Sequence, residues 1–145
     1  LNEAGFWDVV AASTRPFVAS HSNAHALAPS SRNLTDAQLD AIVERDGLVG
    51  LNFGTPFLRS DGRADPDTSL EVMVRHAEYL VARVGEDRVG LGSDFDGVTI
   101  PNAMGDVTGL PRLADALRRH GWDEARITKV FYGNWLALMR RVHEA

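Results

Sequence analysis

The chain has 145 residues, of which 44% are hydrophobic and 24% are charged, and its formal net charge is −5. This length suffices for one domain with a buried core, and no apolar run approaches the roughly 20 residues that a membrane-spanning helix needs. The acidic balance argues against a nucleic-acid partner, because a phosphate-binding surface is normally basic. The absence of cysteine excludes disulfides and thiolate-bound zinc.

The first residue, Leu1, is not an initiator methionine, and no basic segment followed by an apolar segment comes after it. We therefore expect the chain to begin inside a longer protein, and nothing in the sequence identifies a compartment. No repeat, linker or low-complexity segment interrupts the chain. We expect residues 1–145 to form a single region without an internal boundary.

Strand and helix signals alternate along the first half of the chain. The pattern predicts a short amphipathic helix over 5–13, a strand over 17–20, a helix from a capping box at Thr35 and Gln38, and a strand over 48–53. A loop rich in glycine, proline and aspartate follows, through Pro66. Two strands joined by a helix predict a parallel pair.

The second half continues the alternation and then becomes helical. It predicts a helix begun by Thr68 and Glu71 and ended by Gly85, a strand over 88–92, and three tail helices marked by Pro111, Asp123 and Asn134. Three βα units in series indicate an α/β fold with about three parallel strands and a helical tail.

The strands differ between their two faces. Because side chains alternate along a strand, large aliphatic residues share one face, while small or polar residues share the other and end in His21, Asn52 and Asp94. A barrel interior that opens into an active site explains this division. A doubly wound sheet would more often be aliphatic on both faces.

Four segments carry a specific resemblance. In order and spacing, ASHSNAHAL (19–27), SRNLTD (31–36), GLVGLNF (47–53) and GLGSDFDGV (90–98) resemble the renal (membrane) dipeptidase family of binuclear zinc peptidases. The resemblance covers the whole chain. It implies the C-terminal part of a (β/α)8 barrel that hydrolyses dipeptides with two zinc ions.

The resemblance also implies roles for four residues. His21 corresponds to a metal ligand, Arg32 to the arginine that holds the substrate carboxylate, and Asp94 to the aspartate beside the metal-bound water and the substrate amine. Phe57 stands where the family has a substrate-contacting tyrosine, so we expect a flat apolar wall there. The family's other metal ligands precede Leu1, so we expect the chain to need the upstream half of the barrel and to be inactive alone.

Each of these residues has a simpler interpretation as well. His21 could be a structural or surface histidine, and Arg32 could clamp backbone carbonyls within its own loop. Asp94 and Asp96 could suggest a glycosidase, but carboxylates two residues apart on one strand rarely flank a scissile bond. We expect Asp96 and Gly97 to form a turn in which the Asp96 carboxylate bonds backbone amides.

The remaining histidines point less clearly to function. His25 is equally consistent with the rim of a site and with plain surface exposure. We expect His76, within a helix, and His120 and His143, near helix ends, to be structural or solvated.

Two other functions stay open. One is a different metal-dependent hydrolase of the amidohydrolase type, and the other is a non-catalytic barrel fragment. The expected partners are a small dipeptide substrate and the upstream half of the same barrel, with a homodimer as a further possibility and no nucleic acid or membrane segment.

Overall fold

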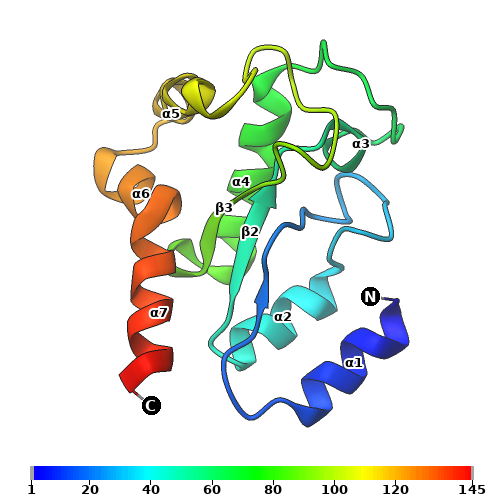
Figure 1. Cartoon of the computed structure of the whole chain (residues 1–145), viewed down its shortest axis with the longest axis vertical. Coiled ribbons are helices and arrows are strands. Elements are labelled where there is room, and N and C mark those ends of the chain that lie inside the picture. The colour runs from blue at the N-terminus through cyan, green and yellow to red at the C-terminus, as the bar shows by residue number, and fades with distance from the viewer. Residues whose placement is uncertain (1, 145) are drawn as a thin grey trace.

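The computed structural model of the protein describes residues 2–144, so Leu1 lies outside the described residues. Its centre is a three-stranded parallel sheet (Figure 1). Strand β1 (Val18–Ala19) pairs with β2 (Leu48–Asn52), and β2 pairs with β3 (Val89–Ser93), so the strands lie in chain order.

One helix precedes the first strand, and the others connect the strands or follow the last one. They are α1 (Glu3–Ala12), α2 (Asp36–Glu44), α3 (Thr55–Leu58), α4 (Leu70–Val84), α5 (Leu110–Arg119), α6 (Glu124–Thr128) and α7 (Asn134–Glu144). Shorter turns are η1 (Glu86–Arg88) and η2 (Val107–Gly109), which are 3-10, and η3 (Lys129–Gly133), which is π-helical. Within residues 2–144, no helix has both the length and the apolar character to span a bilayer.

The two crossover helices identify how the sheet is wound. Helix α2 leads from β1 to β2 and α4 leads from β2 to β3, and the two helices pack against each other as well as against β2. Right-handed crossovers between strands in chain order place both helices on one face of the sheet. Such a singly wound arrangement is that of a barrel segment rather than of a doubly wound sheet.

Most of the predicted helix ends are confirmed. Thr35 and Gln38 form the reciprocal capping box that begins α2. Gly85, with a φ of +86°, ends α4 in a conformation that glycine adopts without steric cost. Pro111 lies in the first turn of α5, and the Asp123 side chain caps α6.

Other predicted ends are wrong by a residue or more. The cap of α4 is Ser69 rather than Thr68, whose hydroxyl instead donates to the Asp65 carbonyl. Asn134 is no cap, because α6, η3 and α7 form one continuous helix in which its side chain donates to the Glu86 and Val89 carbonyls. The first helix spans Glu3–Ala12 rather than 5–13, and β1 is shorter than the predicted 17–20.

The core lies between the sheet and the helices that cover it. Its fully buried side chains include Leu39 and Ile42 of α2, Met73 and Leu80 of α4, and Leu117 of α5. Each such side chain stabilises the fold by about 1.5–3 kcal/mol relative to exposure.

The opposite face of the sheet carries small residues, and the structure gives a physical reason for this that the sequence did not reveal. A Cβ at Gly50 or Gly92 would overlap the Ser20 carbonyl oxygen, because the chain crosses this face immediately after β1. A Cβ at Gly90 would overlap the Trp135 indole, whose Nε1 donates to the Leu91 carbonyl from 3.1 Å. These glycines therefore make room for backbone and for an aromatic ring of α7.

Candidate active site

His21 lies directly after β1, on the segment that crosses the small face of the sheet. Its Nδ1 is 2.7 Å from the Ser20 hydroxyl and its Nε2 is 3.3 Å from Nη2 of Arg32. A guanidinium only donates, so Nε2 is the acceptor, and the ring proton belongs on Nδ1, where it is donated to Ser20. This tautomer leaves a lone pair on Nε2, which is the arrangement a metal ligand requires.

Asp94 lies just beyond the carboxyl end of β3. The alternation of side chains along β3 does not by itself predict the direction of the Asp94 side chain, because a register shift sets Asn52 opposite Ser93 rather than Gly92. Ser93 (φ +41°) and Asp94 (φ +73°) both adopt left-handed conformations, which are costly for residues other than glycine and are concentrated at functional sites. The bend brings the Asp94 carboxylate to Asn52, whose Nδ2 donates to its Oδ2 from 3.0 Å.

Asn52 connects Asp94 to the His21 segment. Asn52 is 1% exposed. Its Nδ2 also donates to the His21 carbonyl at 3.4 Å, and its Oδ1 accepts from the Gly54 amide at 2.6 Å. The buried Asn23 amide then holds the Asn52 backbone from both sides, accepting from its N–H and donating to its carbonyl, both at 3.0 Å. Asn23 thereby continues the β1–β2 pairing beyond the point where the main chain leaves the strand.

Asn33 holds Arg32 and Phe57 in the same neighbourhood. Its buried side chain donates to the Phe57 carbonyl at 2.8 Å and to the Ala28 carbonyl at 2.9 Å. The Arg32 guanidinium carbon lies 5.6 Å from the centre of the Phe57 ring, within the range of a cation–π contact. Phe57 itself belongs to α3, a one-turn helix where a loop was predicted.

His76 of α4 connects two of these loops through hydrogen bonds. Its buried ring bonds the Ala24 amide through Nδ1 at 3.2 Å and the Leu58 carbonyl through Nε2 at 3.0 Å. Burial lowers the pKa of His76 to about 4, so the ring is neutral at pH 7. The burial and hydrogen bonds of His76 agree with the structural role expected for it.

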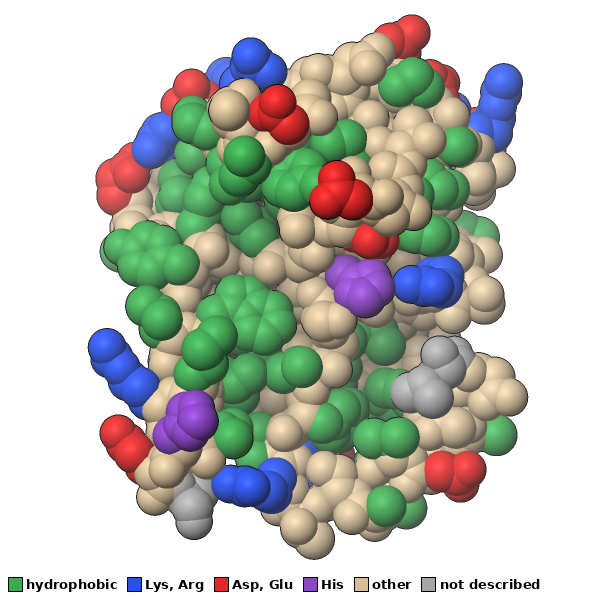
Figure 2. Space-filling model, in the orientation of Figure 1, with side chains coloured by type: hydrophobic (Ala, Val, Ile, Leu, Met, Phe, Trp, Pro, Cys, Tyr) green, Lys and Arg blue, Asp and Glu red, His purple; other side chains and the backbone are tan. Residues whose placement is uncertain are grey.

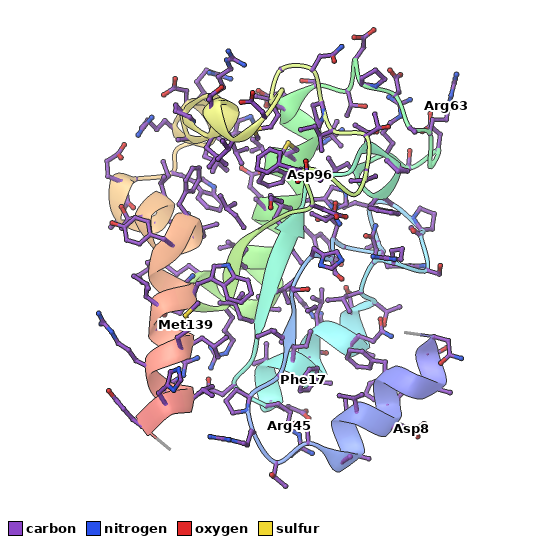
Figure 3. The ribbon with its side chains drawn as sticks, viewed as in Figure 1. Asp8, Phe17, Arg45, Arg63, Asp96 and Met139 are labelled. Carbon is purple, nitrogen blue, oxygen red and sulfur yellow. The ribbon has the colours of Figure 1, made fainter. Side chains whose placement is uncertain are left out.

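The other histidines and Asp96 lie apart from this network. The His120 ring contacts the carboxylates of Glu71 and Glu78, and His143 is exposed in the last turn of α7. His25 is half-buried beside a short bridge between Ala24 and Leu34. The turn predicted at Asp96 forms, with the Gly97 amide donating to the Asp94 carbonyl (Asp96 is labelled in Figure 3). The expected bonds from backbone amides to the Asp96 carboxylate are not formed within residues 2–144.

A groove runs alongside β1 to this site. It has a volume of about 450 Å³, an apolar floor that includes Phe6 and Phe17, and a polar end formed by His21 and Arg32. Asp94 and Phe57 do not line it. Figure 2 shows this face, on which a histidine lies beside a basic side chain with acidic side chains close by.

Hydrogen bonds from the buried side-chain amides of Asn23, Asn33 and Asn52 therefore hold the predicted site residues close together. Sequence reasoning placed Asn52 at a strand end without giving it a role, and it missed Asn23 and Asn33. The signal was present, since both asparagines are close neighbours of predicted site residues. Within residues 2–144, no group of three or more histidine, aspartate or glutamate side chains could hold a metal ion.

Parallel strands in chain order, crossover helices on one face and polar groups gathered at the carboxyl strand ends are the features of an α/β-barrel enzyme. The chain belongs to the membrane dipeptidase family, peptidase family M19, whose family model matches residues 1–145. The resemblance drawn from the sequence is confirmed, as is the fold class of part of a (β/α)8 barrel.

Three relatives illustrate the match. A Rhodobacter sphaeroides metallo peptidase, liganded with a phosphinate mimic of the dipeptide L-Ala-D-Ala, superposes with a TM-score of 0.95 at 55% identity, over 97% of this chain and 40% of that one. A Klebsiella pneumoniae protein of the pqqA 5′ region is 54% identical over 142 residues, 98% of this chain and 52% of its own length. Dipeptidase ataJ of Aspergillus terreus is 36% identical over 144 residues, 99% of this chain and 35% of its own length. The chain thus spans about half or less of the length of these relatives.

Proposed function

We propose that this chain works within a complete barrel as a zinc-dependent dipeptidase, and that it is inactive by itself. Its contribution to the site is His21, Arg32, Phe57 and Asp94. The observation that carries the proposal is the convergence of these residues, from three segments far apart in sequence, at the carboxyl ends of adjacent strands. The family membership of the chain supports a hydrolase of the dipeptidase type.

The donor chemistry of His21 fits zinc. In the tautomer that the Arg32 contact indicates, Nε2 carries the lone pair, and the Ser20 hydroxyl on Nδ1 orients the ring. A catalytic zinc needs about three protein ligands, and the resemblance implies that the others come from the upstream half of the barrel. When bound, zinc would supply a water of lowered pKa and would polarise the peptide carbonyl.

Arg32 and Phe57 suit the carboxylate end of a dipeptide. The guanidinium offers a planar pair of donors that match a carboxylate, and the ring beneath it restricts its orientation. In this chain the Arg32 guanidinium contacts Nε2 of His21, the same lone pair that would face zinc. We propose that Arg32 turns from His21 to the substrate carboxylate when the metal is bound, because two cations cannot share that lone pair.

Asp94 suits the amine end. One of its oxygens is occupied by Asn52, which leaves the other free to accept from a substrate ammonium group or from the attacking water. With Arg32 at one end and Asp94 at the other, the site would hold a short substrate with both termini free and would exclude longer peptides. Asp94 would also move the proton to the leaving amine.

The experiment uses the chain alone and the complete protein that contains it. We expect close to zero zinc in the isolated chain of 145 residues and about two ions per complete protein, measured by elemental analysis after loosely bound metal is removed. The complete protein should cleave dipeptides and should reject N-acetylated dipeptides, C-amidated dipeptides and tripeptides.

Other outcomes assign a different function. Cleavage of cyclic amides or lactones in preference to dipeptides would indicate another amidohydrolase-type enzyme. Two zinc ions in the isolated chain would show that unrecognised residues or a second copy supply ligands. The mass of the complete protein in solution shows whether it forms a homodimer.

A further inference from the structure

We propose that Asn52 is a positioning residue for Asp94, and that Asn52 and Gly97 together determine which oxygen of the Asp94 carboxylate faces the substrate. The inference rests on the proposed function of Asp94. In this arrangement Oδ2 of Asp94 is bound by Asn52, and Oδ1 faces the substrate.

The contacts of Asn52 support this role. Its Nδ2 donates to Oδ2 of Asp94 from 3.0 Å, and its Oδ1 accepts from the Gly54 amide at 2.6 Å. These two bonds leave the amide no freedom to flip, since a flipped Asn52 would present oxygen to a carboxylate and nitrogen to an amide N–H. Asn52 therefore presents a donor to Asp94 in a single orientation.

The backbone of Asn52 is held as firmly as its side chain. The Asn23 amide bonds both its N–H and its carbonyl, and Asn23 is itself fully buried. A donor fixed on a rigid strand end positions its partner more accurately than one carried on a loop. This support matters because Asp94 lies on a turn with two left-handed residues, and within residues 2–144 no other side chain bonds its carboxylate.

Gly97 leaves space for the second oxygen. A Cβ at Gly97 would overlap Oδ1 of Asp94 and would lie 3.2 Å from its Cγ. The φ of Gly97 is not in the left-handed region, so the backbone would accept alanine, and the reason for glycine here is room for the carboxylate. Oδ1 therefore lies beside Gly97 and, among the described residues, accepts no hydrogen bond, which leaves it to interact with the substrate.

The test compares two Asn→Asp substitutions in the complete, zinc-loaded protein. Asn52→Asp keeps the size of the side chain and the acceptor for the Gly54 amide, but it replaces the donor to Asp94 by a carboxylate. The matched control is Asn134→Asp, at a second buried asparagine whose Nδ2 donates to the Glu86 and Val89 carbonyls, both at 2.7 Å, away from the site.

We expect Asn52→Asp to lower kcat roughly 100-fold, the order of loss that follows a misplacement of about 1 Å, while zinc content stays unchanged. Asn134→Asp should lower the unfolding midpoint in urea and leave kcat per zinc-loaded protein unchanged. Equal losses of kcat in the two variants, or an unchanged kcat in Asn52→Asp, would overturn the proposal.

Two further measurements keep the proposal testable if Asn52→Asp does not fold or if the protein does not cleave dipeptides. Gly97→Ala, at the surface, should reproduce the loss of kcat by crowding Oδ1, and an unchanged kcat would count against the assignment of that oxygen. A crystal structure of Asn52→Asp, or of Gly97→Ala where the former fails to fold, should show the Asp94 carboxylate displaced. If the Asp94 carboxylate is not displaced, the positioning role is overturned, whatever the substrate is. If it is displaced but the complete protein has no dipeptidase activity, only the proposed function is overturned.

Discussion

The close approach of the His21 segment to β3 makes Gly92 a sensitive position. A Cβ at Gly92 would lie 2.8 Å from the Cα of His21 and would overlap the Ser20 carbonyl oxygen, whereas ordinary contact begins at 3.4 Å. Both neighbours are backbone atoms and cannot rotate away. Gly92→Ala must therefore move the His21 backbone by about 0.6 Å or more.

The displacement has a stability cost and a functional cost. Overpacking a well-filled site lowers the free energy of unfolding by about 1–3 kcal/mol. Because a shift of about 1 Å lowers activity roughly 100-fold, a shift of about 0.6 Å should lower kcat/KM by at least about tenfold. We expect the zinc affinity to fall in parallel, since the displaced residue, His21, is the proposed zinc ligand.

The assay is urea denaturation together with zinc titration and dipeptide hydrolysis by the complete protein. The matched control is Gly133→Ala, whose new Cβ would lie 3.3 Å from the Thr128 carbonyl oxygen within a helical segment far from the site. Alanine is favoured over glycine in a helix by about 0.5–1 kcal/mol, so this variant should keep its stability and activity. Wild-type zinc affinity and kcat/KM in Gly92→Ala would refute the reasoning.

Three further predictions concern single side chains, each measured in the complete protein. Arg32→Lys keeps the charge but loses the planar pair of donors, so KM for dipeptides should rise about tenfold with little change in kcat, and an unchanged KM would exclude Arg32 as the carboxylate ligand. Asp94→Asn should lower kcat by about 100-fold or more with zinc content intact, and simultaneous loss of zinc would make Asp94 a ligand instead. Burial holds the pKa of His76 at about 4 in the folded state, against 6.5 for an unperturbed histidine. The contribution of His76 to the free energy of unfolding is therefore complete above about pH 6.5 and falls by about 3 kcal/mol as the pH is lowered to 4. Urea midpoints between pH 7 and pH 4 should therefore fall less steeply in His76→Gln than in the wild type, and equal slopes would contradict this.

Local signals in the sequence determined most of the secondary structure and the fold class. The Thr35 capping box, the Gly85 terminator and the Pro111 and Asp123 signals act through neighbours within four residues, so they can be read without knowing the fold. The motifs around His21, Arg32 and Asp94 likewise sufficed for the family, because their order and spacing are specific.

Predictions failed where a distant segment competes for the same group. Asn134 has the residue type of a helix cap, but the Glu86 and Val89 carbonyls take its side chain, and the helix continues through it. Thr68 hydrogen-bonds its own turn and leaves Ser69 to cap α4. These choices depend on tertiary neighbours that a sequence window does not contain.

The arrangement of the site was decided by the tertiary structure. By itself the sequence determined that polar residues end three strands and that one face of the sheet is small. Only the fold showed that the Ser20–His21 backbone and Trp135 fill that face, that a register shift and two left-handed residues turn Asp94 toward Asn52, and that Asn23 and Asn33 tie the loops together. The physical reason is that alternation and capping act over a few residues, whereas these contacts join groups far apart in the sequence, such as Asn52 and Asp94 (42 residues apart) or Leu91 and Trp135 (44 residues apart), and their geometry exists only once the strands have paired.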